Sequence, residues 1–482
     1  MAAVAAVAAI VMTACGSSEL IDGKTVKLDP NNPVAIEIWH YYNGQQQQAF
    51  DNMVAEFNET VGQEQGIIVE AFSQGNISQL MDKVIDSANK KVGSDDIPDI
   101  FAAYADTAYQ MDQMGLAAGL DDYLTSEELS GYLPEYIEEG RIGSNGELKI
   151  FPIAKSTEIM MLNKTDWDKF SSATGASLND LETYEGITKV SESYYQWTDG
   201  LTQTPDDGKA LFGRDAMANY FIIGYKQFGI DLFSVKDGQV TFQPKEDIMR
   251  KLWDNYYVPY VNGWFGAYGN FRADDAKTGD LLTFIGSTSG ATYFPDKVKR
   301  DDIEPYSIEM LALKPPCFQD GKKVAVQQGA GMVVTKSNPR TEYACVTFLK
   351  WFTEDERNIE FSIESGYLPV KKSANQAEKI LDVTAKMKRT DSIKKLEKTL
   401  PVSIETVNEY DLYTNKAFNG GTKARKVLED SMQQQAKKDT AEVEKLVSNG
   451  MSRSEAAARY TTDENFKQWY KSFVKELESS IQ

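Results

Sequence analysis

Apolar positions in the first third of the chain switch repeatedly between strand-like and helix-like spacing. Three short apolar runs, 34–39, 66–72 and 98–104, predict buried strands. Residues 77–88 predict a helix, and an earlier helix follows the first run. Four apolar side chains lie on one face of that earlier helix: Phe50, Met53, Val54 and Phe57. Because strands alternate with helices, the pattern predicts an α/β fold with a parallel sheet flanked by helices on both faces.

The loops after these strands are candidate binding loops. In parallel sheets, ligands bind beyond the carboxyl ends of the strands. The loops that follow the three runs are 40–43, 73–76 and 104–106. The candidate ligand-binding residues in the first and third loops are His40, Tyr41, Tyr42, Asn43, Tyr104 and Asp106.

A second informative stretch joins two glycines to an apolar strand. Gly329 and Gly331 permit a positive φ or a close approach of the backbone to another group. Residues 332–335 predict a short buried strand after them. We therefore expect the chain to pass close to a ligand or to another segment at Gly329.

Two consecutive helices follow this strand. An N-cap side chain before a proline, at 338–339, predicts that the first helix begins near Arg340. Thr353 and Glu356 have the spacing of a capping box for the second helix. That helix should end at Gly366, where glycine can adopt the left-handed conformation of a C-cap.

Length and charge narrow the function classes. The 482 residues predict about three domain-sized units or two large lobes. The formal net charge is −21, from 72 acidic and 51 basic residues. Such a negative field repels phosphate backbones, so nucleic-acid binding is not expected. With the single histidine His40, we expect no histidine-built metal or triad site, and no cofactor.

The N-terminal residues predict an exported, anchored protein. Residues 2–11 form an uncharged apolar run too short to span a bilayer. The sequence MTACG at 12–16 resembles the lipobox of bacterial lipoproteins. This resemblance implies a signal peptide at 1–14 and a lipid on Cys15. The polar composition of 15–33 predicts a tether.

The other two cysteines leave two alternatives open. Cys317 follows two prolines in a predicted loop, and Cys345 lies in the first of the two helices above. In an exported protein they can form a disulfide. Alternatively they are free thiols, and Cys345 is a small apolar filler of its helix.

Several segments resemble one family. The segments "IEIWHYYNG", "TGDLLTFIGSTSG" and "SGYLPVKK" are similar to segments of the extracellular solute-binding proteins that feed bacterial ABC importers, most of all the branch binding sugars and glycerol 3-phosphate. The resemblance implies a two-lobed, type II-like periplasmic-binding-protein fold, with a mostly parallel sheet in each lobe and a hinge between them. It places 34–152 plus 311–354 in the first lobe, and 153–310 plus 355–482 in the second.

The same resemblance implies further site residues. Those implied by position in the family are Ser156, Thr157, Arg214, Tyr220, Tyr367 and Lys416. Hydroxyls that cap a turn are an equal alternative for Ser156 and Thr157. An alanine is the alternative to Lys416 at the family's basic position, which argues against a phosphate ligand. Tyr367 follows a helix C-cap and precedes Pro369, so its backbone is held on both sides.

The loop at 286–290, Gly-Ser-Thr-Ser-Gly, is a candidate from its chemistry. Its backbone N–H groups and hydroxyls suit an oxygen-rich or anionic ligand. It lacks the lysine spacing of a P-loop. We therefore add Ser287 and Ser289 to the candidate residues.

Together these features predict a lipid-anchored solute-binding component of an ABC importer. It would capture a carbohydrate, polyol or sugar phosphate between two closing lobes and deliver it to the permease. The resemblance also implies a monomer on the outer face of the cytoplasmic membrane. One alternative is a secreted hydrolase of oligosaccharides or esters, with Asp99 and Asp106 as acid and base. Another is a binding subunit that reports to a membrane sensor.

Overall fold

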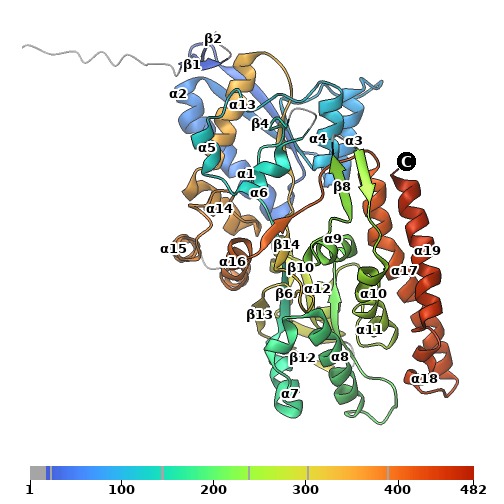
Figure 1. Cartoon of the computed structure of the whole chain (residues 1–482). Coiled ribbons are helices and arrows are strands. Elements are labelled where there is room, and N and C mark those ends of the chain that lie inside the picture. The colour runs from blue at the N-terminus through green and yellow to red at the C-terminus, as the bar shows by residue number, and fades with distance from the viewer. Residues whose placement is uncertain are drawn as a thin grey trace, which may run out of the picture.

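The chain folds into two lobes, one above the other in Figure 1, each with its own hydrophobic core. We call them lobe 1, which contains the first sheet in the sequence, and lobe 2. They are seen in a computed structural model that describes residues 18–21, 24–142, 146–236, 239–300, 303–387 and 390–481.

Lobe 1 is built on a four-stranded sheet in the order β15-β5-β3-β4. β3 is parallel to β4 and β5, whereas β15 is antiparallel to β5. The strands are β3 (Val34–His40), β4 (Ile67–Ser73), β5 (Ile100–Ala103) and β15 (Gly331–Val334). The predicted strands and the parallel arrangement of the first three are confirmed.

Helices from two distant parts of the chain cover this sheet. The first group is α1 (Gly44–Phe57), α2 (Gln63–Gln65), α3 (Ile77–Ala88), α4 (Ala105–Gln113), α5 (Ser126–Ser130) and α6 (Pro134–Gly140). The second group is α13 (Pro339–Phe352), α14 (Asp355–Ser365), α15 (Ala377–Lys386) and α16 (Asp391–Glu409). The predicted helix at 77–88 is confirmed.

Lobe 2 has a mixed sheet in the order β13-β6-β10-β7. Only the β10–β7 pair is parallel, because β6 runs antiparallel to both β10 and β13. The strands are β6 (Glu158–Asn163), β7 (Ala210–Arg214), β10 (Leu281–Ser287) and β13 (Met310–Leu313). The prediction of a mostly parallel second sheet is therefore wrong.

Both faces of the lobe 2 sheet are covered. Met160 and Leu162 of β6 join the large core, and Ile159 and Met161 join a smaller one on the opposite face. The covering helices from the middle of the chain are α7 (Lys164–Thr174), α8 (Tyr184–Asp199), α9 (Met217–Gln227), α10 (Glu246–Asp254), α11 (Tyr257–Val261) and α12 (Arg272–Thr278). The C-terminal helices are α17 (Gly421–Ser448), α18 (Arg453–Ala458) and α19 (Asp463–Ser480).

Short ribbons complete the structure. They are β1 (Ser18–Ile21) with β2 (Lys24–Lys27), β8 (Phe233–Lys236) with β9 (Gln239–Phe242), β11 (Lys297–Arg300) with β12 (Ile303–Ser307), and β14 (Val324–Val326) with β16 (Asp411–Tyr413). The last pair is parallel and lies where the chain passes between the lobes. Bridges from Lys155 to Leu368 and from Ser156 to Gln328 lie beside it. The three crossing segments, 155–157, 326–328 and 411–413, therefore run together.

The predicted lobe boundaries need two corrections. Leu311 belongs to β13 and pairs with Leu162 in lobe 2, although 311–354 was assigned to the first lobe. Conversely, α14–α16 pack in the core of lobe 1, although 355–482 was assigned to the second. The apolar faces of these helices cause the second shift: the ring of Phe361 lies 5.0 Å from that of Phe352. The chain returns to lobe 2 only after α16.

Local signals around α13 and α14 are partly confirmed. The Asn338 side chain accepts hydrogen bonds from the first N–H groups of α13, as expected for an N-cap. Gly366 ends α14 with φ 75°, also as expected. The predicted capping box is wrong: α14 has Glu354 as its N-cap, without a side-chain bond. Thr353 Oγ1 instead donates to the carbonyl of Leu349, one turn back.

The structure tests only part of the predictions made for the N-terminal segment and the cysteines. The predicted signal peptide and Cys15 lie outside the described residues. Within the predicted tether, Val26 and Leu28 are buried in the core of lobe 1, so this part of 15–33 is packed against the lobe and is not a free tether. Cys317 and Cys345 are free thiols. Across the described ranges, no helix combines the length and hydropathy that crossing a membrane requires.

Candidate functional site

A cavity of about 510 Å³ lies between the lobes, next to the crossing segments. Eight of the fifteen predicted ligand-binding residues line it. They are Tyr104, Asp106, Ser156, Ser287, Ser289, Gly329, Tyr367 and Lys416. A second cavity of about 920 Å³ shares part of this wall, including Glu139, Gln327 and Lys416. The two cavities therefore form one cleft with two chambers.

The other seven predicted residues do not line the cavity. Four are buried within the lobes with 0–1% exposure: His40, Tyr42, Arg214 and Tyr220. Thr157 is also buried, and its hydroxyl donates to the carbonyl of Val326 at 2.7 Å, which joins two crossing segments. Asn43 is the exposed N-cap residue of α1. Tyr41 lies behind the wall, against Tyr367. Residue type suggested contact with a ligand, but burial removes five of these seven side chains from the surface.

Tyr367 is the best-defined wall residue of lobe 1. Its hydroxyl lies 3.1 Å from that of Tyr41, and its ring packs edge-on against Tyr42. The left-handed residue before it, Gly366, has no Cβ, and one built there would lie 3.1 Å from the Cα of Ser289 in lobe 2. Burial raises the pKa of both Tyr41 and Tyr367, so both hydroxyls stay protonated and can donate.

Gly329 has the conformation that the sequence predicted. Its φ is 98°, in the region that favours glycine, and a Cβ there would lie 3.0 Å from the carbonyl oxygen of Ala154. Its own carbonyl accepts a hydrogen bond from the ammonium group of Lys155 at 2.9 Å. The glycine therefore lets two crossing segments lie in contact at the cavity wall.

A buried ion pair supports the wall beside Gly329. The Lys155 ammonium, 2% exposed, donates to Glu139 Oε2 at 2.6 Å. The amide of Gln327 also donates to Glu139 Oε2. Glu139 comes from α6 of lobe 1 and lines both chambers. Two crossing segments thus hold one carboxylate in place, and it offers an acceptor to a hydroxyl in the cleft.

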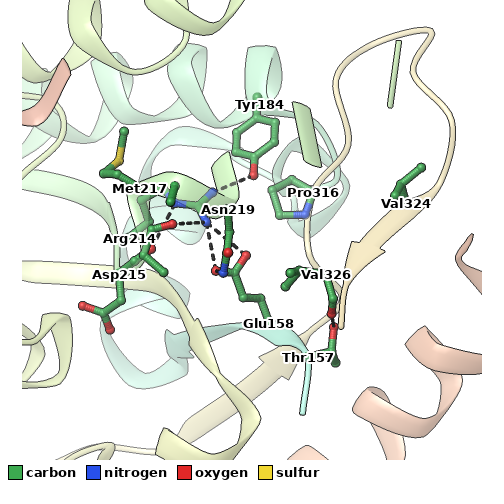
Figure 2. A network of polar contacts seen from close by, with 12 residues as sticks. Thr157, Glu158, Tyr184, Arg214, Asp215, Met217, Asn219, Pro316, Val324 and Val326 are labelled. Carbon is green, nitrogen blue, oxygen red and sulfur yellow. Dashed lines mark hydrogen bonds and ion pairs between the residues drawn. The ribbon is translucent and has the colours of Figure 1, made fainter. Parts of the chain in front are cut away.

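Lobe 2 contributes a polar network that begins in its core. Figure 2 shows Arg214 and Asn219 converging on Glu158. Arg214 Nη2 lies 3.0 Å from both oxygens of Glu158, and Nη1 donates to the hydroxyl of Tyr184. Asn219 donates to Glu158 and accepts from Arg425 Nη2 at 2.8 Å. Arg425 lines the cavity. The network therefore fixes the orientation of its guanidinium at the cavity wall through bonds that begin in the buried core.

Sequence reasoning missed several polar residues of the wall, among them Glu139, Asn219, Gln327 and Arg425. Gln327 lies two residues before Gly329 in the sequence. The other three come from helices whose local pattern only signals an amphipathic face. Their place in the cleft depends on how the lobes meet, which no short motif encodes.

The wall chemistry suits hydrogen bonding. Ser287 is the last residue of β10, and Ser289 lies in the 3-10 turn that follows. Their hydroxyl oxygens are 2.9 Å apart. Within the described ranges, no group of three or more histidine, cysteine, aspartate or glutamate side chains could hold a metal ion. The cleft therefore presents hydroxyls, amides and paired charges to a ligand.

Comparison with known proteins gives a match to one family model and to several solved structures. The sequence profile of the family described as bacterial extracellular solute-binding protein matches residues 52–389. No curated protein sequence matches the chain.

Among solved structures, the cyclic α-maltosyl-1,6-maltose binding protein from Arthrobacter globiformis is similar, with 17% identity and a TM-score of 0.65 over 93% of this chain and 99% of that one. UgpB from Mycobacterium tuberculosis, in complex with glycerophosphocholine, has 17% identity and a TM-score of 0.63 over 94% and 100%. The ABC substrate-binding protein Lmo0181 from Listeria monocytogenes, in complex with cycloalternan, has 14% identity and a TM-score of 0.60 over 93% and 100%. At these identities the likeness establishes the fold, the two-lobed α/β fold of periplasmic-binding proteins.

Proposed function

The chain belongs to the bacterial extracellular solute-binding proteins, and we propose that it captures a carbohydrate or related polyol or sugar-phosphate solute between its closing lobes. It performs no chemistry on the solute and hands it to the permease of an ABC importer. The lipid on Cys15 keeps the monomer at the outer face of the cytoplasmic membrane.

The composition of the cavity wall carries this proposal. Lobe 1 brings Tyr367 and the Glu139 carboxylate, and lobe 2 brings Ser287, Ser289 and the Arg425 guanidinium. Hydroxyls, carboxylate and guanidinium are the donors and acceptors that a polyhydroxylated solute requires. They belong to different lobes, so a solute that bonds to both stabilises the closed arrangement.

Charge at the wall favours the uncharged members of this class. Asp106 and Glu139 stand opposite Lys416 and Arg425 among the lining residues. Glu139 is paired with Lys155, and Lys416 lies 3.1 Å from Glu138. A phosphate would need an excess of donors and positive charge, so a sugar or polyol is the first choice and a sugar phosphate the second.

A thermal-shift screen tests the proposal. The compounds are sugars, oligosaccharides, sugar phosphates and glycerophosphodiesters. A solute at a hundred times its dissociation constant should raise the unfolding free energy by about 2.7 kcal/mol. Turnover of an oligosaccharide or ester, with no stabilisation by any compound, would favour the hydrolase alternative and contradict the proposal.

Two further measurements address closure and anchorage. For a compound found in the screen, small-angle scattering should give a smaller radius of gyration with the compound than without it. The anchor is tested by Cys15→Ser, which should release the protein from the membrane fraction, because stable attachment requires the acyl chains on this residue. A variant that stays membrane-bound would rule out the lipobox interpretation.

A further inference from the structure

A contact across the cavity joins the two lobes at Asp106. Asp106 lies in the first turn of α4 in lobe 1, and its carboxylate reaches the N-terminal end of α17 in lobe 2. The Thr422 hydroxyl donates to Asp106 Oδ2 at 3.4 Å. Both Asp106 and Thr422 line the cavity.

The end of α17 lacks a cap of its own. Its N-cap residue is Gly420, with φ 84°, and no side chain within α17 bonds to its first N–H groups. The first N–H groups of a helix have no partners within it, and the helix dipole gives this end a partial positive charge. The carboxylate of Asp106 supplies, from the other lobe, the negative group that this helix end favours.

The sequence of α17 leaves room for the carboxylate. A Cβ built on Gly421 would lie 2.8 Å from Asp106 Oδ1 and 3.2 Å from Oδ2, too close for a real side chain. Arg425, one turn further along, also faces this carboxyl. Burial raises the pKa of Asp106, and the charge of Arg425 opposes that shift. Glycine, hydroxyl and guanidinium on one helix end thus fit one carboxylate.

We propose that Asp106 is a latch: it docks on the N-terminal end of α17 and stabilises the closed arrangement of the lobes independently of any solute. This inference rests on the proposed closing of the lobes. When the lobes separate, α4 and α17 part, and the contact is lost. The latch therefore sets the fraction of closed molecules, and a solute that binds only the closed form has its apparent affinity scaled by that fraction.

The distance between the lobes in the protein without solute tests the latch. Spin labels go on Asp82→Cys in α3 and Lys475→Cys in α19, two exposed positions in different lobes, in a Cys15→Ser, Cys317→Ser background. Cys345 is fully buried and stays unlabelled. Pulsed electron resonance then gives the distribution of interlobe distances.

Asp106→Ala and Gly421→Ala should each lower the ratio of closed to open molecules about two- to thirtyfold, the range for a charge at a helix end. Alanine at 421 is also a good helix former, so that variant blocks the carboxylate without weakening α17. The matched controls are Gln110→Ala on α4 and Lys423→Ala on α17, both exposed, and they should leave the distribution unchanged.

A bulky substitution in the cavity, the wedge variant, distinguishes an error in the latch proposal from an error in the proposed closing of the lobes. Ser287→Trp places a large ring in the cavity, so it should lengthen the distance whether or not Asp106 is a latch. If the wedge lengthens the distance while Asp106→Ala and Gly421→Ala leave it unchanged, the latch is wrong and closure stands. If the wedge also has no effect, the lobes do not separate, and both the proposed closure and the latch are wrong.

Discussion

Each lobe carries a four-stranded sheet, but different interactions support the cleft wall in the two lobes. In lobe 1, the end of β3 is packed in aromatic rings: His40 lies 4.8 Å from the ring of Phe50 and 5.3 Å from that of Tyr42. In lobe 2, the end of β7 carries Arg214 in a buried ion pair with Glu158. Apolar packing fixes the shape of one wall, whereas directional bonds fix the position of a polar group on the other.

The largest loss of stability is expected from breaking the buried ion pair between Arg214 and Glu158 in lobe 2. Glu158→Ala leaves the Arg214 guanidinium, 1% exposed, without its partner. Removing one member of a buried pair costs about 3–5 kcal/mol of unfolding free energy. Urea unfolding followed by circular dichroism measures the loss.

The double variant Arg214→Met, Glu158→Leu is the control. Because neither charge is then left buried and unpaired, it should recover most of the stability. It should not restore the position of Arg425, since Asn219 loses the carboxylate that orients it. A double variant as unstable as Glu158→Ala would contradict the role given to the ion pair.

Acid should lower the unfolding free energy through His40, which packs among the aromatic rings at the end of β3 in lobe 1. Burial lowers the pKa of His40 from 6.5 to about 4. Since the unfolded chain takes up this proton first, the contribution to stability is present above pH 6.5 and is lost as the pH falls from 6.5 to 4. The loss amounts to about 3 kcal/mol. Unfolding free energies measured from pH 7 to 4 should show this decline.

His40→Asn serves as the matched variant for the acid effect. Its side-chain oxygen can still accept the hydrogen bond that His40 Nδ1 accepts from the backbone N–H of Tyr42 at 3.2 Å. It does not titrate in this range, so its stability should fall less between pH 7 and 4. An identical decline in both proteins would assign the acid effect to other groups.

A smaller effect is expected where the aromatic support meets the cleft. Tyr367 is only 5% exposed, so Tyr367→Ala would open a hole in the core as well as change the wall. Tyr367→Phe removes the hydroxyl alone. If that hydroxyl bonds to the solute, affinity for a compound found in the screen should fall roughly fivefold, the effect of one neutral hydrogen bond of about 1 kcal/mol.

Calorimetric titration measures this change, with Tyr41→Phe as the control. Tyr41 bonds to Tyr367 but does not line the cavity. Its variant should therefore weaken binding less than Tyr367→Phe. Equal affinity in the wild type and Tyr367→Phe would remove the Tyr367 hydroxyl from the binding site.

The smallest effect concerns the thiols, one in each lobe. Cys345 is fully buried in lobe 1, and Cys317 is partly exposed in lobe 2. Burial raises the pKa of both thiols. In the Cys15→Ser protein, reductant should leave the unfolding midpoint unchanged, and a thiol reagent should modify Cys317 before Cys345. A lower midpoint in reductant would reveal a disulfide that the structure lacks.

Local sequence signals correctly predicted the elements and helix ends that depend only on neighbouring residues. The apolar runs at β3 and β4, the helix at 77–88, the Asn338 cap and the left-handed Gly366 all follow from spacing or backbone preference. Thr353 shows the limit. Its hydroxyl has the spacing of a cap, but it bonds back to Leu349 and lies 2.7 Å from the hydroxyl of Tyr132 in the folded lobe.

Chain order predicted part of the site. Tyr104 and Asp106 follow a strand end, so they reach the cleft. Arg214 also ends a strand, yet it turns into the core because Glu158 lies there, on a strand more than fifty residues away in the sequence. Arg425 reaches the cleft from a helix whose pattern gives no sign of it. Which of the wall residues contact a solute stays a prediction.

The interleaved path of the chain also determines the order in which the protein can fold. The sheet of lobe 1 needs β15 beside β5, a pairing across more than two hundred residues, and its core still awaits α16. Lobe 2 in turn lacks Phe473, which stacks on Phe221, until almost the whole chain is present. Pairings between such distant segments form slowly. A chain made from its N-terminus therefore leaves apolar surface of both cores exposed until its last helices are present, and such exposed surface promotes aggregation.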